Sequence, residues 1–170
     1  YSCPLFGGDT VRTPGPASIS IFAFGTLPKG SMVRRAGAKS GHRIFVTGTI
    51  GDASLGLRLL REPARKAAWA LSDADAKFLI DRYRLPRPRV ALAEALRTEA
   101  SAAMDISDGL MKDFARMCAA SGTGGVIEAA RVPLSTPARK VLAARGATLA
   151  DLVTGGEDYQ ILAAVAAERA

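Results

Sequence analysis

Acidic residues beside glycines, or at the ends of expected elements, are the groups of this sequence best suited to chemistry. They lie in three motifs, Gly7–Thr10, Asp105–Leu110 and Gly155–Tyr159. A glycine pair lets the backbone approach a bound group and offer its N–H donors, while a neighbouring carboxylate suits Mg²⁺, which prefers oxygen ligands. Taken alone, the first and third motifs are explained more simply as ordinary turns with exposed acids. These motifs therefore indicate either phosphate and metal binding or plain turns.

The middle motif, Asp105–Leu110, places two acids around a serine. If a strand ends at Asp105 and a helix begins near Ser107, both Asp105 and Asp108 gather at a helix N-terminus, where acids and phosphates are favoured. Ser107 would cap the helix or donate its hydroxyl to a phosphate. Capping requires fewer acids than are present, so capping and a functional role both stay open.

Other reactive groups are scarce. One histidine, His42, and two distant cysteines, Cys3 and Cys118, supply neither a zinc cluster nor a histidine-based triad. The P-loop and dinucleotide-binding fingerprints are missing. The loop 34–39 offers Arg35, whose guanidinium suits phosphate oxygens, although a surface role is as ordinary. Acids, glycine loops and an arginine together match what phosphoryl transfer needs.

Composition sets outer limits on the class of protein. Of 170 residues, 48% are hydrophobic, which is enough for a buried core. The apolar runs are too short to span a bilayer and no secretory signal opens the chain, so we expect a cytoplasmic protein without a membrane partner. The net charge of +7 is concentrated between Arg58 and Arg97. Nucleic-acid binding through these arginines is one interpretation; a solvated surface is simpler, and we expect no nucleic-acid partner.

Apolar periodicity and turn residues predict strands alternating with helices, and therefore an α+β or α/β fold. The expected strands are Ile19–Gly25, Arg43–Thr47, Gly125–Glu128 and Gln160–Val165, and the expected helices begin at Asp52, Ser72, Val90, Ser107 and Ser135. The first forty residues contain no convincing helix. We therefore expect residues 1–40 to be the end of a preceding domain and residues 41–170 to form an α/β domain.

The order of the motifs resembles the thiamine-monophosphate kinase family, within the aminoimidazole-ribonucleotide-synthetase-like superfamily. Besides the three acidic motifs, the resemblance includes Arg35–Lys39 and Ile44–Asp52, and it extends along nearly the whole chain. It implies an α+β fold with a C-terminal α/β domain, preceded by a remnant of an N-terminal β-sheet domain for ATP binding and dimerisation. The implied activity is direct in-line transfer of the γ-phosphoryl group of ATP to thiamine monophosphate.

The resemblance also implies a role for each matching residue. Gly8 and Asp9 would contact ATP, Arg35 would reach its phosphates, and Ser107 would bind the nucleotide. The implied Mg²⁺ ligands are Asp9, Asp105 and Asp108, and Glu157 would touch the thiamine substrate. Asp105, Asp108 and Arg35 are thus the expected catalytic residues, with Mg²⁺ as cofactor and ATP as co-substrate.

Members of that family are considerably longer than this chain. They carry an acid-rich segment before the first motif and a tail with an aromatic residue that packs on the substrate. We therefore expect this chain to be a fragment lacking both ends, inactive alone, and homodimeric only as the full-length protein. The alternatives are another ATP-dependent enzyme of the same superfamily or a non-catalytic nucleotide-binding remnant.

Overall fold

The computed structural model describes residues 3–169, which belong to two compact units divided after Met32. Residues 3–32 of the first unit contain turns and bends but neither helix nor strand. Its apolar side chains face solvent; Ile19, Ile21 and Phe24, for example, are 85–89% exposed. The strand predicted at Ile19–Gly25 is therefore wrong for this structure. A strand needs a neighbour to take its N–H and C=O groups, and nothing else in residues 3–32 offers one.

The second unit, from Val33 onward, contains helices around a small sheet, so the α+β class is confirmed. Its strands and α-helices, in chain order, are β1 (Arg43–Val46), α1 (Asp52–Arg61), α2 (Arg65–Ala68), α3 (Asp73–Arg84), α4 (Ala93–Glu99), β2 (Ala100–Ile106), α5 (Leu110–Ser121), α6 (Thr136–Ala143), α7 (Leu149–Thr154) and β3 (Gln160–Val165). Short 3₁₀ turns cover Val90–Leu92, Ala129–Arg131 and Ala167–Arg169.

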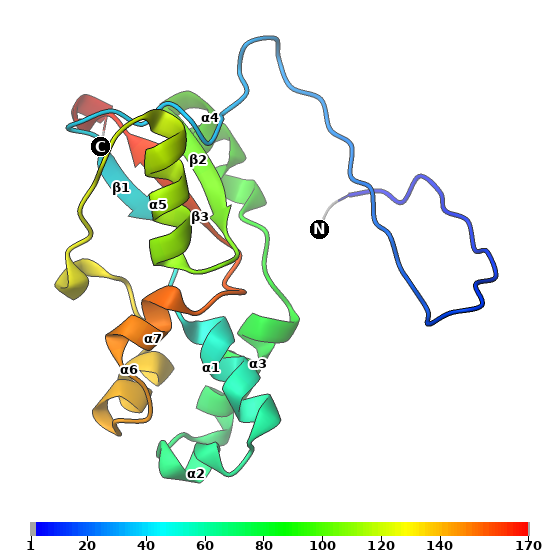
Figure 1. Ribbon diagram of the computed structural model, residues 1–170, viewed down its shortest axis with the longest axis vertical. Coiled ribbons are helices and arrows are strands. Elements are labelled where there is room, and N and C mark those ends of the chain that lie inside the picture. The colour runs from blue at the N-terminus through cyan, green and yellow to red at the C-terminus, as the bar shows by residue number, and fades with distance from the viewer. Residues whose placement is uncertain (1–2, 170) are drawn as a thin grey trace. The chain divides into compact units, whose positions relative to one another are not determined.

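The sheet is antiparallel and has the order β1-β3-β2, so the last strand lies between the first two. Phe45 of β1 pairs with Ala163 of β3, which in turn pairs with Ala103 of β2. Figure 1 shows α5 lying across one face of this sheet, with α1, α3, α6 and α7 grouped beyond one end of the strands. The last residues of β2 and the first residues of β3 therefore face the helical group.

Two hydrophobic clusters stabilise these two parts. The first joins the sheet to α5 through side chains such as Ile106, Met117 and Leu162. The second lies among the helices and includes Leu79 and Leu152. Since these side chains are almost fully buried, each contributes roughly 1.5–3 kcal/mol to the free energy of folding.

Local signals placed most elements correctly. The capping box predicted at Ser72 and Asp75 is present at the start of α3, and Ser135 caps α6 by accepting a hydrogen bond from the Ala138 N–H. The helix predicted from Ser107 begins three residues later, after Gly109. A carboxylate in the first turn takes the Ser107 N–H instead, as described below.

The strand predicted at Gly125–Glu128 is wrong: this segment has no secondary structure. It packs on α5, where a Cβ atom added to Gly125 would lie 2.3 Å from the ring of Phe114. No hydrogen bond joins it to β1 among the described residues, although both line one cavity. Packing against a helix thus replaces strand pairing here.

Candidate active site

The second and third acidic motifs lie side by side where β2 ends and β3 begins. The backbone N–H of Glu157 donates to the carbonyl of Ser107, and the N–H of Tyr159 donates to the carbonyl of Ile106, both at 2.8 Å. Gly156 makes this approach possible, because a Cβ atom there would lie 2.5 Å from the Ser107 oxygen. Motifs separated by some fifty positions in the sequence therefore form one site.

Three predicted site acids gather in this place. Asp105, Asp108 and Glu157 are all exposed. Their effect converges on Tyr159, whose pKa is raised first by the charge of Glu157, then by burial and a hydrogen bond to Glu157, and further by Asp105 and Asp108. The hydroxyl group of Tyr159 therefore lies in the negative electrostatic potential of all three carboxylates. Sequence reasoning missed Tyr159 as a site residue, although it closes the third motif.

The backbone of the third motif is strained. Glu157 and Tyr159 have φ angles of 73° and 47°, in the left-handed region that side chains with a Cβ atom disfavour. Such strain, of order 1–3 kcal/mol per residue, persists only when surrounding contacts impose it, and it is frequent at functional sites. The hydrogen bonds to Ile106 and Ser107 supply part of that constraint.

Between these two residues, Asp158 points into the protein and is 1% exposed. Its carboxylate accepts hydrogen bonds from the N–H groups of Gly51 and Ala53 at the start of α1. Burial raises its pKa to about 6, and the charge of Asp52 adds to the rise, while the two N–H donors and Arg82 oppose it. The buried member of the Glu157–Asp158 pair is therefore an anchor for the exposed one.

Asp52, at the first position of α1, is also buried. Its carboxylate accepts hydrogen bonds from the hydroxyls of Ser135 and Thr49. Burial raises the pKa of Asp52, and these hydrogen bonds and Arg82 oppose the rise. Asp52 thus joins the loop before α1 to the cap of α6.

The loop between β2 and α5 has its own buried carboxylate. Asp113, in the first turn of α5, is fully buried and accepts hydrogen bonds from the N–H groups of Ser107 and Asp108 through Oδ2. Ser107 therefore caps no helix; its own N–H is instead bound by a carboxylate of the helix that follows. Asp108 itself forms ion pairs with Lys112 and Arg116, and these two cations, first among the causes, lower its pKa.

Arg35 belongs to the segment that follows Met32 and runs beside β2, where Ala103 donates its N–H to the carbonyl of Arg34. Its side chain is exposed and has no ion-pair partner in the described part of the chain. Gly8 and Asp9 lie in the first unit, where the only described hydrogen bond of the Asp9 side chain is to the Thr10 N–H. Their joining with Asp105 and Asp108 stays a prediction.

No group of three or more His, Cys, Asp or Glu side chains among residues 3–169 is arranged to hold a metal ion. The chemistry of the donors still suits Mg²⁺, which is commonly held by one or two carboxylates together with substrate phosphates. Asp105 is exposed and unpaired in the described region, whereas Asp108 would first have to leave its two cations. A magnesium site is therefore a matter for proposal.

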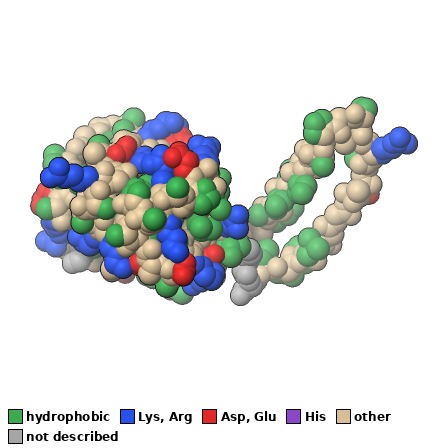
Figure 2. Space-filling model, turned by 90° about the horizontal axis from the view of Figure 1, so that it is seen from below, with side chains coloured by type: hydrophobic (Ala, Val, Ile, Leu, Met, Phe, Trp, Pro, Cys, Tyr) green, Lys and Arg blue, Asp and Glu red, His purple; other side chains and the backbone are tan. Residues whose placement is uncertain are grey.

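Half of the basic residues from Arg58 to Arg97 form ion pairs. Ion pairs with nearby acids hold five of them, namely Arg58, Arg65, Lys66, Lys77 and Arg97. Figure 2 shows Lys and Arg side chains scattered over the compact unit with acids between them. This face offers no continuous basic stripe for a polynucleotide. No helix in residues 3–169 is both long and apolar enough to cross a membrane.

Comparison with known proteins places this arrangement in a family. Residues 39–170 match the C-terminal domain of AIR synthase related proteins. The chain belongs to this family. Its membership confirms the superfamily resemblance drawn from the motifs, since AIR is aminoimidazole ribonucleotide.

Curated proteins similar to this chain include several thiamine-monophosphate kinases. That of Caulobacter vibrioides is 41% identical over 169 residues, which cover 97% of this chain and 46% of the relative. That of Escherichia coli K12 is 40% identical over 162 residues, covering 95% of this chain and 47% of the relative. The chain thus spans about half the length of the curated relatives it matches.

Solved structures of this family give the same picture. The thiamine-monophosphate kinase of Stenotrophomonas maltophilia K279a has a TM-score of 0.74 at 35% identity, over 84% of this chain and 45% of that one. A structure described as AaThiL complexed with AMPPCP and TMP has a TM-score of 0.73 at 33% identity, over 81% and 43%. The hydrogenase maturation protein HypE of E. coli, at 20% identity and a TM-score of 0.63, shares the fold alone.

Proposed function

We propose that this chain is part of a thiamine-monophosphate kinase that transfers the γ-phosphoryl group of ATP to thiamine monophosphate, giving thiamine diphosphate. The observation that carries the proposal is that Asp105, Asp108 and Glu157 lie together where β2 ends and β3 begins. The similarity to a protein solved with AMPPCP, an analogue of ATP, and TMP supports this choice of substrates.

The chain's own residues divide the work by position. Asp105 and Asp108 would hold Mg²⁺, which supplies charge neutralisation between the reacting phosphates. Ser107, beside them, would bind the nucleotide, and Glu157 would contact the cationic thiamine. The backbone N–H of Glu157 donates to the carbonyl of Ser107, and this contact would hold the main chain of Glu157 beside the proposed nucleotide ligand. Such fixed placement of both reactants is the main requirement of in-line phosphoryl transfer.

The first unit and the segment that follows it would complete the nucleotide site. Gly8 and Asp9 would contact ATP, with Asp9 as a further Mg²⁺ ligand, and Arg35 would reach the phosphates. We further propose that the full-length protein is a cytoplasmic homodimer, as the family resemblance implies. Residues 1–40 would then be the end of an N-terminal domain, and this chain alone would be inactive.

The test uses the full-length protein in a coupled assay for thiamine diphosphate, with ATP and Mg²⁺. Asp105→Asn should lower kcat by at least about 100-fold, because one carboxylate of the metal site is lost. Asp73→Asn is the matched control, since Asp73 is exposed at the start of α3 and, among the described residues, forms an ion pair only with Lys66. Wild-type protein that phosphorylates another acceptor but not thiamine monophosphate would refute the substrate assignment.

A further inference from the structure

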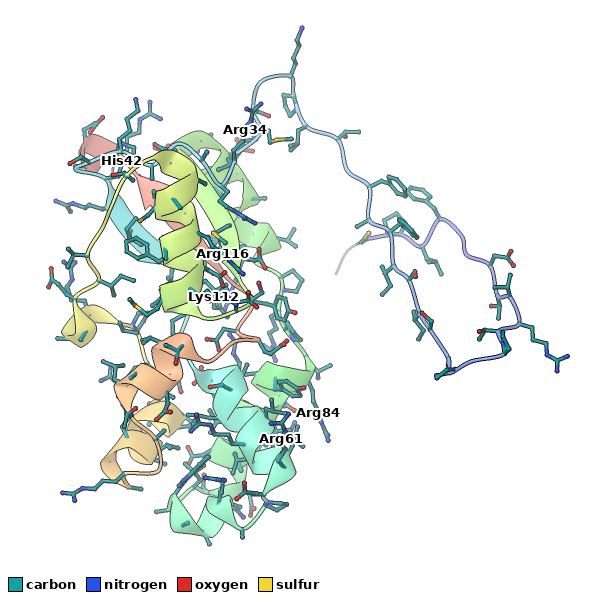
Figure 3. All side chains as sticks on the ribbon, viewed as in Figure 1. Arg34, His42, Arg61, Arg84, Lys112 and Arg116 are labelled. Atoms are coloured by element: carbon teal, nitrogen blue, oxygen red, sulfur yellow. The ribbon has the colours of Figure 1, made fainter. Side chains whose placement is uncertain are left out.

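Two basic side chains lie on the acidic site and have no role in the function proposed so far. Lys112 Nζ is 3.0 Å from Asp108 Oδ2, and Arg116 Nη1 is 2.6 Å from the same oxygen. Both come from the first two turns of α5, four residues apart, and Figure 3 shows them on the same side of that helix. The carboxylate of Asp108 therefore forms ion pairs with two basic side chains at the place where phosphates are expected.

Arg116 is held in place independently of Asp108. Its Nη1 donates a hydrogen bond of 2.8 Å to Oδ1 of Asp113, which is fully buried. The other oxygen of Asp113 accepts the N–H groups of Ser107 and Asp108. If Asp108 turned away to a metal ion, Arg116 would stay beside the loop, because its buried partner belongs to the helix core.

The rest of the guanidinium group is available for a ligand. Among residues 3–169, no hydrogen bond is found from Nε or Nη2 of Arg116, and 41% of the side chain is exposed. The Lys112 side chain is 61% exposed. A guanidinium group fixed on one side by a carboxylate presents its remaining N–H donors in a plane, the geometry that binds two phosphate oxygens together.

Charge balance gives a reason for cations here. Asp105, Asp108 and Glu157 would repel anionic phosphates if no positive charge accompanied them. Structural neutralisation of Asp108 would need one cation only, and the site has two. The second cation also has a buried anchor that an ordinary surface ion pair lacks.

We propose that Arg116, with Lys112 beside it, is a phosphate subsite that binds oxygens of the reacting phosphates. This inference deepens the proposed function and rests on it for the identity of the phosphates. Two sources share this chemistry, namely the polyphosphate of the nucleotide and the monoester phosphate of the acceptor. Lys112 would add charge without fixing geometry, because an ammonium group is a compact point charge.

Binding without turnover is the first measurement, made by calorimetry on the full-length protein with AMPPCP and, separately, with thiamine monophosphate. Arg116→Gln should raise the Kd of one of them about 10- to 100-fold, the usual effect of losing a charge-assisted hydrogen bond. Arg116→Lys should recover part of the affinity that Arg116→Gln loses. Lys112→Gln should raise the Kd of the same ligand about 3- to 10-fold. The matched control is Arg61→Gln, an exposed arginine at the end of α1.

The ligand whose Kd rises identifies the source of the bound phosphate, and KM for the same substrate should rise with it. Unchanged Kd and KM values in Arg116→Gln, for both ligands, would overturn the inference even if Asp105→Asn abolished kinase activity. Conversely, a wild-type protein that binds AMPPCP through Arg116 but makes no thiamine diphosphate would retain the subsite and refute the proposed reaction. Thermal midpoints of Arg116→Gln and Arg116→Lys close to that of wild type ensure that both comparisons concern folded protein.

Discussion

The carboxylate of Asp158 accepts a hydrogen bond of 2.7 Å from the backbone N–H of Gly51. A second bond, from Ala53 at 3.2 Å, completes a buried cap on α1. The cap joins the loop that contains Glu157 to the helix that follows β1. It therefore fixes the position of a proposed substrate ligand from the protein interior, and its protonation state affects the stability of the fold.

The pH dependence of stability follows from the raised pKa of Asp158, which burial brings to about 6 from 3.8. Because the folded state holds this proton more tightly than the unfolded state, the contribution favours folding below pH 4 and is lost as pH rises to about 6. The loss is about 3 kcal/mol. Asp158→Asn cannot ionise, so the stability of wild type relative to this variant should fall over that interval.

Thermal midpoints of the full-length wild type and Asp158→Asn, measured between pH 4 and pH 7.5, check this expectation. Asp52, whose pKa is also raised by burial, is present in both proteins and largely cancels in the difference. Two curves that stay parallel throughout would mean that Asp158 does not titrate in this range.

Gly156→Ala should damage the site by pushing its two motifs apart. The new Cβ atom would lie 2.5 Å from the Ser107 carbonyl oxygen, a backbone atom that cannot rotate away. We expect a loss of about 1–3 kcal/mol in stability and a lower kcat, measured by thermal unfolding and by the coupled assay. Gly124→Ala is the control, because nothing lies within 4 Å of its added carbon. Equal activity of the two variants would contradict the close approach.

Tyr159→Phe should weaken the orientation of Glu157. The variant lacks the hydroxyl that interacts with the charge of the Glu157 carboxylate, and the side chain is 43% exposed, so the loss is modest. We expect KM for thiamine monophosphate to rise about 3- to 10-fold, with KM for ATP unchanged. Initial rates at varied concentrations of each substrate separate the two. A larger effect on the ATP constant would assign Tyr159 to the nucleotide instead.

Leu79→Ala tests the hydrophobic cluster among the helices, which packs beneath the loops of the candidate site. Leu79, on α3, is fully buried in the cluster that also contains Leu55 and Leu59 of α1, and its truncation should cost about 2–5 kcal/mol. Leu85→Ala, at a position 62% exposed, should change stability by less than about 0.5 kcal/mol. Thermal unfolding provides the measurement. At a temperature where both are folded, their KM values should match, since neither side chain is placed in the site.

Local sequence signals were sufficient to predict the helices that begin at a capping residue and the strand that ends at a turn residue. The capping residues Ser72 and Ser135 lie where their side chains predicted, and β1 matches its β-branched run to within one residue. The strand predicted at Ile19–Gly25 has the right composition but no partner in its unit. Composition describes one strand, whereas pairing depends on a second segment.

Sequence reasoning named the exposed acids of the candidate site but not the buried carboxylates behind them. Asp105, Asp108 and Glu157 lie together where β2 ends and β3 begins, and the roles that the family resemblance implies for them stay predictions. Which member of the Glu157–Asp158 pair points inward depends on the left-handed backbone of Glu157 and Tyr159. The sequence does not reveal this conformation, because neither of those two residues is glycine. The role of Asp113 was equally hidden, since it depends on where α5 begins.

The central place of β3 in the sheet has a consequence for synthesis on the ribosome. β1 and β2 each pair with β3 and not with each other, so neither can join the sheet until Gln160–Val165 has left the exit tunnel. The nascent chain must hold two strand-forming segments unpaired while more than a hundred residues emerge between β1 and β3. Mutations that slow the docking of β3 would then lower the yield of folded protein in cells more than its melting temperature suggests.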